Sequence, residues 1–220
     1  TVDSLILTDE KGQRPRFKHS AEEIDVLVSL LALKPWNTRG TIIRLLGMIG
    51  DRRASEPLLK QLAVEDNPKN RRRIFTSLAQ LRCRAAAAEV PKYFGAKLSA
   101  TKKNYNWPVA AAWGDLGDPD QVPKMIELLG SEDRLIPLYA AFALGWAFGG
   151  PEAMGEVPLR GRPDVVLVPA AGRKFEKKAF GDAPPAAQLK TEWAAFWKAN
   201  QAGYSWSEEK NALRAAPKPE

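Results

Sequence analysis

The chain has 220 residues, of which 45% are hydrophobic and 27% charged, and this composition indicates a foldable chain that forms one mid-sized domain or an elongated array. Its single cysteine excludes an intramolecular disulfide, and its single histidine excludes a multi-histidine metal site. No apolar run reaches the roughly 18 residues that a membrane-spanning helix requires.

The first predicted elements are an arm and a helix. Residues 1–18 mix an apolar run with a polar, basic stretch, and we expect them to form an extended N-terminal arm. Ser20 and Glu23 have the spacing of a capping box, so a helix is predicted to begin directly after Ser20 and to cap the amino end of the fold. His19, just before this cap, is interpreted as an ordinary surface histidine.

A repeated pattern occupies the middle of the chain. A proline in a similar context recurs at intervals of 34, 32 and 35 residues, at Pro57, Pro91, Pro123 and Pro158. Upstream of it, a Gly-Asp pair occurs at residues 50–51 and again at 117–118, whereas the copy that ends at Cys83 has lost both residues. Two markers in the same register indicate a repeat of about 33 residues.

The local chemistry of each unit predicts two helices. Gly50 and Gly117 suit the left-handed conformation that ends a helix, and Asp51 and Asp118 suit the N-cap of the next one. Pro119 then falls at the first helical position, where a missing N–H costs nothing. Two antiparallel helices cannot bury both apolar faces alone, so the units must stack. The sequence therefore predicts an all-α fold, an α-solenoid of about four helical hairpins.

These repeats resemble the HEAT-like repeats of the phycobilin-lyase type, which are known from bacterial proteins. The matching residues are Leu46, Gly47, Gly50, Asp51, Ala54, Pro57, Leu58 and Leu59 in one copy, and Gly114, Gly117, Asp118, Pro119, Val122 and Pro123 in the third. The resemblance covers roughly residues 38–160 and implies an α-solenoid of HEAT-like hairpins. Most similar repeats are binding scaffolds, and with one cysteine and no site motif we transfer no lyase activity.

Beyond Pro158 the helical pattern ends, and the chain becomes rich in Gly and Pro, with a β-prone run at 165–168. A last amphipathic helix follows, with one face formed by Leu189, Trp193, Phe196 and Trp197. The predicted organisation is an arm at 1–18, a HEAT-like solenoid at 19–162, an irregular Gly/Pro-rich arm at 163–187, a closing helix at 188–207 and a flexible tail at 208–220.

The charge is unevenly distributed, and this suggests a binding surface. Residues 51–103 carry 13 Lys/Arg against 5 Asp/Glu, whereas residues 104–172 carry 4 against 9. Stacked inter-helix loops would bring the densest basic runs together, so the candidate partner-binding cations are Lys69, Arg71, Arg72, Arg73, Lys102 and Lys103. Aromatic candidates in predicted loops or in the tail are Trp36, Trp107 and Trp206. The alternatives for the basic run are a solvated face and phosphate binding.

Two other positions, Cys83 and Asp115, are considered for a chemical role. Cys83 lies between Arg82 and Arg84, where neighbouring cations would favour a reactive thiol, although a small residue filling a degenerate turn is the simpler interpretation. Asp115 lies near Trp113, as in a DNA-glycosylase branch of HEAT-like proteins that combines an aromatic cleft with an Asp and an Arg. Because Asp115 belongs to the repeat's own turn, in an acidic block, we interpret it as structural.

The sequence therefore favours a non-catalytic scaffold that binds a protein partner, as an accessory subunit of a multi-subunit assembly. No catalytic residue, cofactor or metal ligand is predicted. The alternatives are nucleic-acid binding through the basic second repeat and a lyase-like or glycosylase-like enzyme subunit. Because the chain opens on Thr1, and because its Trp-rich closing helix is similar to those of exported bacterial HEAT-like proteins, export is expected, with the cytoplasm as the alternative.

Overall fold

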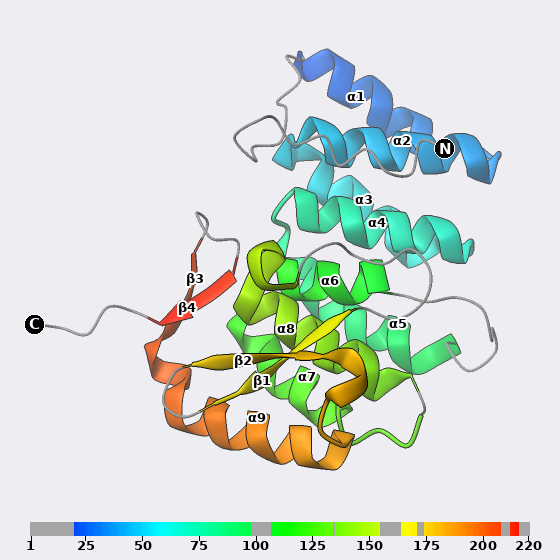
Figure 1. The fold of residues 1–220 in the computed structure, drawn as a ribbon. Helices are drawn as coiled ribbons and strands as arrows, with labels where there is room; N and C mark the ends of the chain where they lie inside the picture. The colour runs from blue at the N-terminus through cyan, green and yellow to red at the C-terminus, as the bar shows by residue number, and fades with distance from the viewer. Residues whose placement is uncertain are drawn as a thin grey trace, which may run out of the picture. The chain divides into compact units, whose positions relative to one another are not determined.

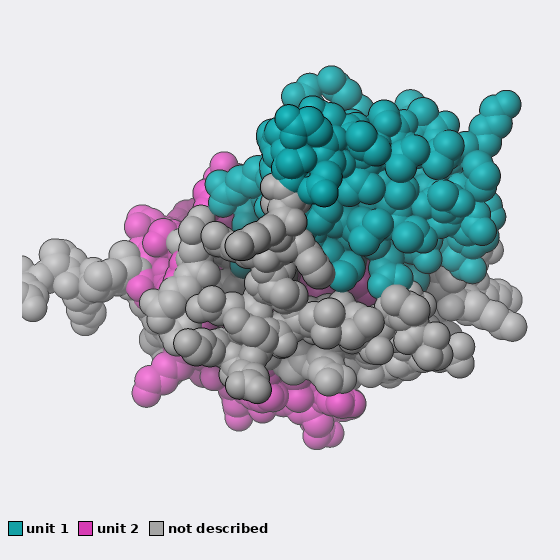
Figure 2. Space-filling model, turned by 90° about the horizontal axis from the view of Figure 1, so that it is seen from above, with its two compact units in different colours: residues 1–83 teal, residues 84–220 magenta. Residues whose placement is uncertain are grey.

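A computed structural model describes residues 20–97, 107–133, 135–154, 164–170, 174–207 and 212–215 (Figure 1). Most of these residues are helical, which confirms the all-α prediction in its coarse form. The chain divides into two compact units, unit 1 at residues 1–83 and unit 2 at residues 84–220 (Figure 2), so the segment predicted as one solenoid at 19–162 spans both. The predicted arm at 1–18 and His19, Lys102 and Lys103 lie outside the described residues.

Unit 1 is built from helices joined by tight turns. Its helices are α1 (Ala21–Ser29), α2 (Trp36–Ile49), α3 (Ser55–Val64) and α4 (Pro68–Gln80). Helix α2 packs mainly against α4, which also contacts α3. The predicted capping box begins α1, because the Glu23 amide donates to Ser20 Oγ at 3.2 Å and the Ser20 amide donates to Glu23 Oε2 at 2.7 Å.

The Gly-Asp turns form as predicted. Gly50 adopts φ 79° after α2, and the Asp51 carboxylate then accepts the Arg53 amide at 2.9 Å. In unit 2, Gly117 adopts φ 65°, and Asp118 accepts the Asp120 amide at 3.1 Å. In both places the aspartate caps a single 3-10 turn, which leads directly into the following α-helix.

A left-handed residue also occurs where the sequence lacks the glycine. Among the described residues, positive φ angles occur at Gly50, Arg82, Gly117 and Gly150. These positions are 32, 35 and 33 residues apart, close to the intervals of 34, 32 and 35 residues between the prolines of the sequence marker. Arg82 therefore holds, at φ 57°, a positive φ angle like those of the glycines in the other copies, at the steric cost of a side chain.

Unit 2 combines helices with two short hairpins. Its helices are α5 (Val90–Lys97), α6 (Trp107–Asp115), α7 (Val122–Leu128), α8 (Ile136–Met154, with a kink at Gly150) and α9 (Ala186–Asn200). Helix α8 lies at the centre of this unit and contacts α6, α7 and α9. Gly114 permits the approach of α6 to α8, because a Cβ there would lie 2.6 Å from the carbonyl oxygen of Ala143.

Three predictions for the carboxyl-terminal part are wrong. The segment predicted as an irregular arm contains an antiparallel hairpin, in which β1 (Val165–Pro169) pairs with β2 (Phe175–Ala179) against α8 and α9. The closing helix ends at Asn200, and the last residues assigned to it form β3 (Tyr204–Ser207). Part of the predicted flexible tail is β4 (Ala212–Ala215), which pairs with β3 and packs on α8.

The physical reason is burial against α8 and α9, which local sequence does not reveal. The side chains of Val166, Leu167 and Val168 are all buried, so the first strand is fixed by packing on these helices. Leu213 of β4 is buried as well. The apolar face predicted for α9 is confirmed, since Leu189, Trp193, Phe196 and Trp197 are all buried.

Candidate functional site

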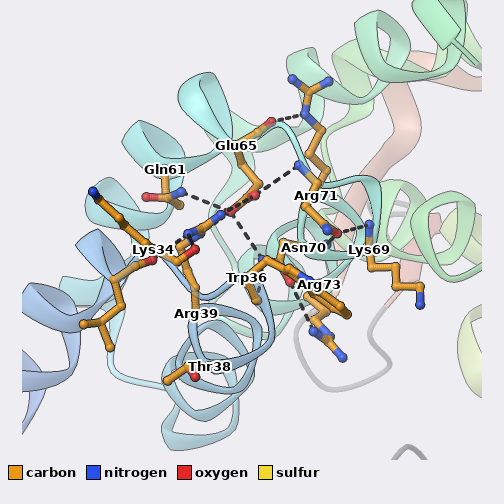
Figure 3. Close-up of polar contacts among 12 residues, drawn as sticks. Lys34, Trp36, Thr38, Arg39, Gln61, Glu65, Lys69, Asn70, Arg71 and Arg73 are labelled. Carbon is orange, nitrogen blue, oxygen red and sulfur yellow. Dashed lines mark hydrogen bonds and ion pairs between the residues drawn. The ribbon is translucent and has the colours of Figure 1, made fainter.

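A buried ion pair lies at one end of unit 1 (Figure 3). The Arg39 guanidinium donates from Nε to Glu65 Oε2 at 2.6 Å and from Nη2 to Glu65 Oε1 at 2.9 Å. Glu65 is buried and also accepts from the side-chain amide of Gln61 at 3.1 Å and from the backbone amide of Asn67 at 3.1 Å. Arg39 uses its remaining nitrogen, Nη1, to bond the Leu33 carbonyl at 2.6 Å.

These contacts decide the ionisation of Glu65. Burial by itself would raise the pKa of this carboxyl group, but the hydrogen bonds from Arg39, Asn67 and Gln61 and the charge of Arg39 outweigh it and lower the pKa to about 2. Glu65 is therefore ionised throughout the physiological range. The ion pair connects α2 to the loop between α3 and α4, so it acts as a structural clamp.

The same network holds the first turns of α2 and α4 together. The Asn70 side-chain amide donates to the Trp36 carbonyl at 2.8 Å, and Arg73 Nη1 donates to Asn70 Oδ1 at 3.1 Å. Arg71 donates through Nε to the Glu65 carbonyl. Further along, Ser77 Oγ donates to the Ile43 carbonyl at 2.9 Å, so α2 and α4 run in the same direction.

Gly40 makes room for this arrangement. A Cβ at this position would lie 2.0 Å from Arg73 Nη1 and 2.4 Å from Asn70 Oδ1, so both side chains of α4 occupy the space that glycine leaves on α2. Arg73 is therefore held across the surface of α2 and is not an extended, solvated side chain.

The segments around the clamp carry both cations and exposed apolar side chains. We call residues 33–36 and 64–73 the loop edge; both stretches lie at the end of unit 1 where α2 and α4 begin. Three large apolar side chains are exposed there, namely Leu33 (37%), Trp36 (43%) and Val64 (74%). Lys69 Nζ lies 5.4 Å from the centroid of the Trp36 ring, a cation–π contact at the surface.

The structure separates the predicted basic residues into two groups. Lys69 and Arg71–Arg73 lie in the first two turns of α4 and not in a loop. Arg71 and Arg73 are half-buried and engaged in the network, so they are not freely exposed side chains. Lys34 and Lys69 are exposed and Arg72 is half-buried, and within the described part of the chain none of the three forms an ion pair.

The three aromatic candidates also differ in where the structure places them. Trp36 is the first residue of α2 and is exposed, as predicted. Trp107 was assigned to a loop, but it begins α6 and is fully buried, with its ring 4.7 Å from that of Tyr139 and 5.5 Å from that of Phe142. It therefore belongs to the core of unit 2 and offers no contact to a partner. Trp206 lies in β3, where its backbone pairs with Leu213.

The two other positions considered for a chemical role, Asp115 and Cys83, take part in structural contacts. Asp115 Oδ1 accepts a hydrogen bond from Trp146 Nε1 at 3.0 Å, which joins α6 to α8, and Trp113 is buried. Cys83 is half-buried in the turn after α4, where its amide donates to the Leu78 carbonyl at 3.0 Å.

Sequence reasoning missed the centre of this site. Arg39 and Glu65 were not singled out, and neither were Leu33, Lys34 or Val64. The ion-pair partners are 26 residues apart, so no local spacing connects them. The one available signal was a charged residue in each of two consecutive units, at positions that stacking would bring together.

No described helix combines the length and apolar character needed to cross a bilayer. Within the same residues, no three His, Cys, Asp or Glu side chains gather in a way that could hold a metal ion.

No protein-family model matches the chain, and no curated protein matches it significantly. The site must therefore be interpreted from its own geometry.

Proposed function

We propose that this protein is a non-catalytic scaffold whose HEAT-like hairpins form an α-solenoid, and that it binds a protein partner through the loop edge of unit 1. Its role is that of an accessory subunit in a larger assembly. The observation that carries the proposal is the exposure of Leu33, Trp36 and Val64 beside Lys34 and Lys69. Exposed aromatic and apolar side chains among cations are the composition of a protein-binding surface.

The rigidity of this surface supports the proposal. The Arg39–Glu65 pair and the Asn70–Trp36 contact fix both loops of the edge before any partner arrives. A preorganised surface loses less conformational entropy on binding than a flexible one. The parallel packing of α2 on α4 also supports stacked hairpins within unit 1, since equivalent helices of successive repeats lie side by side.

Nucleic-acid binding is the second candidate, favoured by one observation. Helix α4 places Lys69, Arg71, Arg72 and Arg73 in its first two turns, with no acidic residue in its first turn. A phosphate backbone would be attracted to this charge. A phosphate backbone has no apolar groups that could cover the exposed Leu33 and Val64. Protein binding therefore explains more of the exposed side chains at this edge.

Affinity capture tests the proposal. The tagged 220-residue chain is incubated with an extract of its source cells, and the proteins retained are quantified by mass spectrometry. The double variant Trp36→Ala/Lys69→Glu should lose its specific partner. Lys198→Glu, a charge reversal on the exposed surface of α9 in unit 2, should retain it. Equal capture by the parent and the double variant would refute the loop edge as the binding surface.

A further inference from the structure

The loop edge carries an excess of positive charge, which an acidic partner would complement. It contains five Lys/Arg and two Asp/Glu, and one of these acids, Glu65, is already neutralised by Arg39. Both α2 and α4 begin at this edge, and neither has an acidic residue in its first turn. Cations near the positive end of a helix dipole destabilise it, and closely spaced cations repel one another.

The cations at this edge are of two kinds. Arg71 and Arg73 donate to the Glu65 carbonyl and to Asn70 Oδ1, so part of their hydrogen-bonding capacity is used within unit 1. Lys34, Lys69 and Arg72 have no ion-pair partner in the described residues. These three side chains are the ones that an incoming anionic group can engage without breaking the network.

The exposed apolar side chains indicate which class of anionic partner fits this surface. Leu33 lies directly before Lys34, and Val64 lies directly before the clamped Glu65. Lys69 Nζ lies 5.4 Å from the centroid of the Trp36 ring, so at this point a cation and an exposed apolar side chain are in direct contact. A phosphate backbone would satisfy only the cations, whereas carboxylates that alternate with bulky apolar side chains would satisfy both.

Resting on the proposed function, we infer that the occupant of the loop edge is an acidic protein segment in which Asp or Glu alternates with bulky apolar residues. Its carboxylates pair with Lys34, Lys69 and Arg72, and its apolar side chains cover Leu33, Trp36 and Val64. Charge steering then speeds association, while the apolar contacts provide the affinity that salt does not remove.

Fluorescence anisotropy with defined ligands tests this assignment on the full-length chain. The probe is a short synthetic peptide that alternates Glu with Leu, compared with one that alternates Glu with Ser, one that alternates Gln with Leu, and a short DNA duplex. We expect the Glu/Leu peptide to bind at least about tenfold more tightly than each comparison ligand at physiological salt. Equal binding of the Glu/Ser peptide would overturn the apolar part of the inference.

Variants locate the binding. Lys69→Glu and Val64→Ser should each weaken binding of the Glu/Leu peptide, and Lys198→Glu should not. Because Lys69 and Val64 are exposed, neither variant should lower the melting temperature of the parent, which circular dichroism verifies. Tight DNA binding with a steep salt dependence that Lys69→Glu flattens would assign the edge to nucleic acid and overturn the inference.

Residues 1–10 of the chain are the alternative occupant that the test must exclude. Residues 1–10 contain Asp3, Asp9 and Glu10 around the apolar run Leu5–Leu7. Replacing Leu5, Ile6 and Leu7 by Ser in the full chain should leave the affinity for the Glu/Leu peptide unchanged. A rise in affinity would show that this segment occupies the edge, and would overturn the assignment to a partner.

The outcomes distinguish the inference from the proposed function. If no peptide binds, but the loop-edge double variant still loses the captured partner, the inference fails and the scaffold function stands. If that variant retains the partner, the proposed function itself fails.

Discussion

Arg39 and Glu65, 26 residues apart, form a two-point ion pair that fixes both loops of the candidate docking surface. The Glu65 side chain is completely buried, and that of Arg39 nearly so. Each charge therefore depends on the other. Removing one of them leaves an uncompensated charge in a low-dielectric environment.

Arg39→Ala should lower the free energy of unfolding by about 3–5 kcal/mol, the usual cost of leaving a buried charge unpaired. The matched control is Lys60→Ala, which breaks the Glu56–Lys60 pair, where both side chains are 76% exposed. That change should cost less than about 0.5 kcal/mol. Urea denaturation measures both. Equal stabilities for the two variants would show that the ion pair is not a clamp.

The Glu65 carboxylate also predicts how stability depends on pH. Its pKa is about 2 in the folded protein, against an ordinary value of 4.5. The unfolded chain therefore takes up a proton at a higher pH than the folded chain. The stabilisation is fully present above about pH 5 and is lost as the pH falls towards 2.

Between pH 5.5 and pH 2, Glu65 should account for a loss of about 3 kcal/mol, at ~1.36 kcal/mol per pKa unit. Glu65→Gln removes the titrating group, so its unfolding free energy should fall less steeply over this range. Denaturation curves recorded across the range measure the difference. Parallel pH profiles for parent and variant would contradict the assignment.

Gly50→Ala should destabilise unit 1 by about 1–2 kcal/mol through backbone conformation alone. Gly50 has φ 79°, and an added Cβ would meet nothing within 4 Å, so no steric clash with neighbours contributes. Gly181 is equally open but lacks the positive φ angle, so Gly181→Ala should change stability by less than about 0.5 kcal/mol. Thermal melts of the two variants test this difference. A neutral Gly50→Ala would show that the left-handed turn is not required.

Helix α9 should be essential to the stability of unit 2. The Trp193 ring lies 5.1 Å from that of Phe148 and 5.5 Å from that of Phe175. Trp193→Ala/Trp197→Ala should therefore cost several kcal/mol, given ~3–5 for each buried aromatic truncation. Trp36→Ala removes an exposed ring and should cost far less. Near-parental melting of the α9 double variant would mean that α9 does not close the core.

The parts of the fold that the sequence predicts are those determined by neighbouring residues. The Ser20 capping box and the left-handed Gly50 follow from local backbone chemistry, and both are present. The hairpin at Val165–Ala179 follows from packing on α8 and α9, which no local pattern encodes. Trp107 was misassigned for the same reason, because its burial depends on Tyr139 and Phe142, more than 30 residues away.

The candidate site, too, could be predicted from the sequence only in part. The basic run at residues 69–73 is visible in the sequence as an excess of charge. Its separation into arginines engaged in the network and cations without an ion-pair partner depends on Glu65 and Asn70, and on the space that Gly40 leaves on α2. Such pairings are set by helix stacking and become visible only in three dimensions.

Site-specific photo-crosslinking tests the central claim, that the loop edge binds a protein partner, most directly. A photoreactive amino acid is placed at Trp36 or Val64, both exposed on the loop edge, and at Lys198 on α9 as the control. After irradiation in source-cell extract, positions 36 and 64 should trap the same protein, and the crosslinked segment should be acidic and rich in apolar residues. No trapped protein at these two positions, or equal trapping at position 198, would contradict the account.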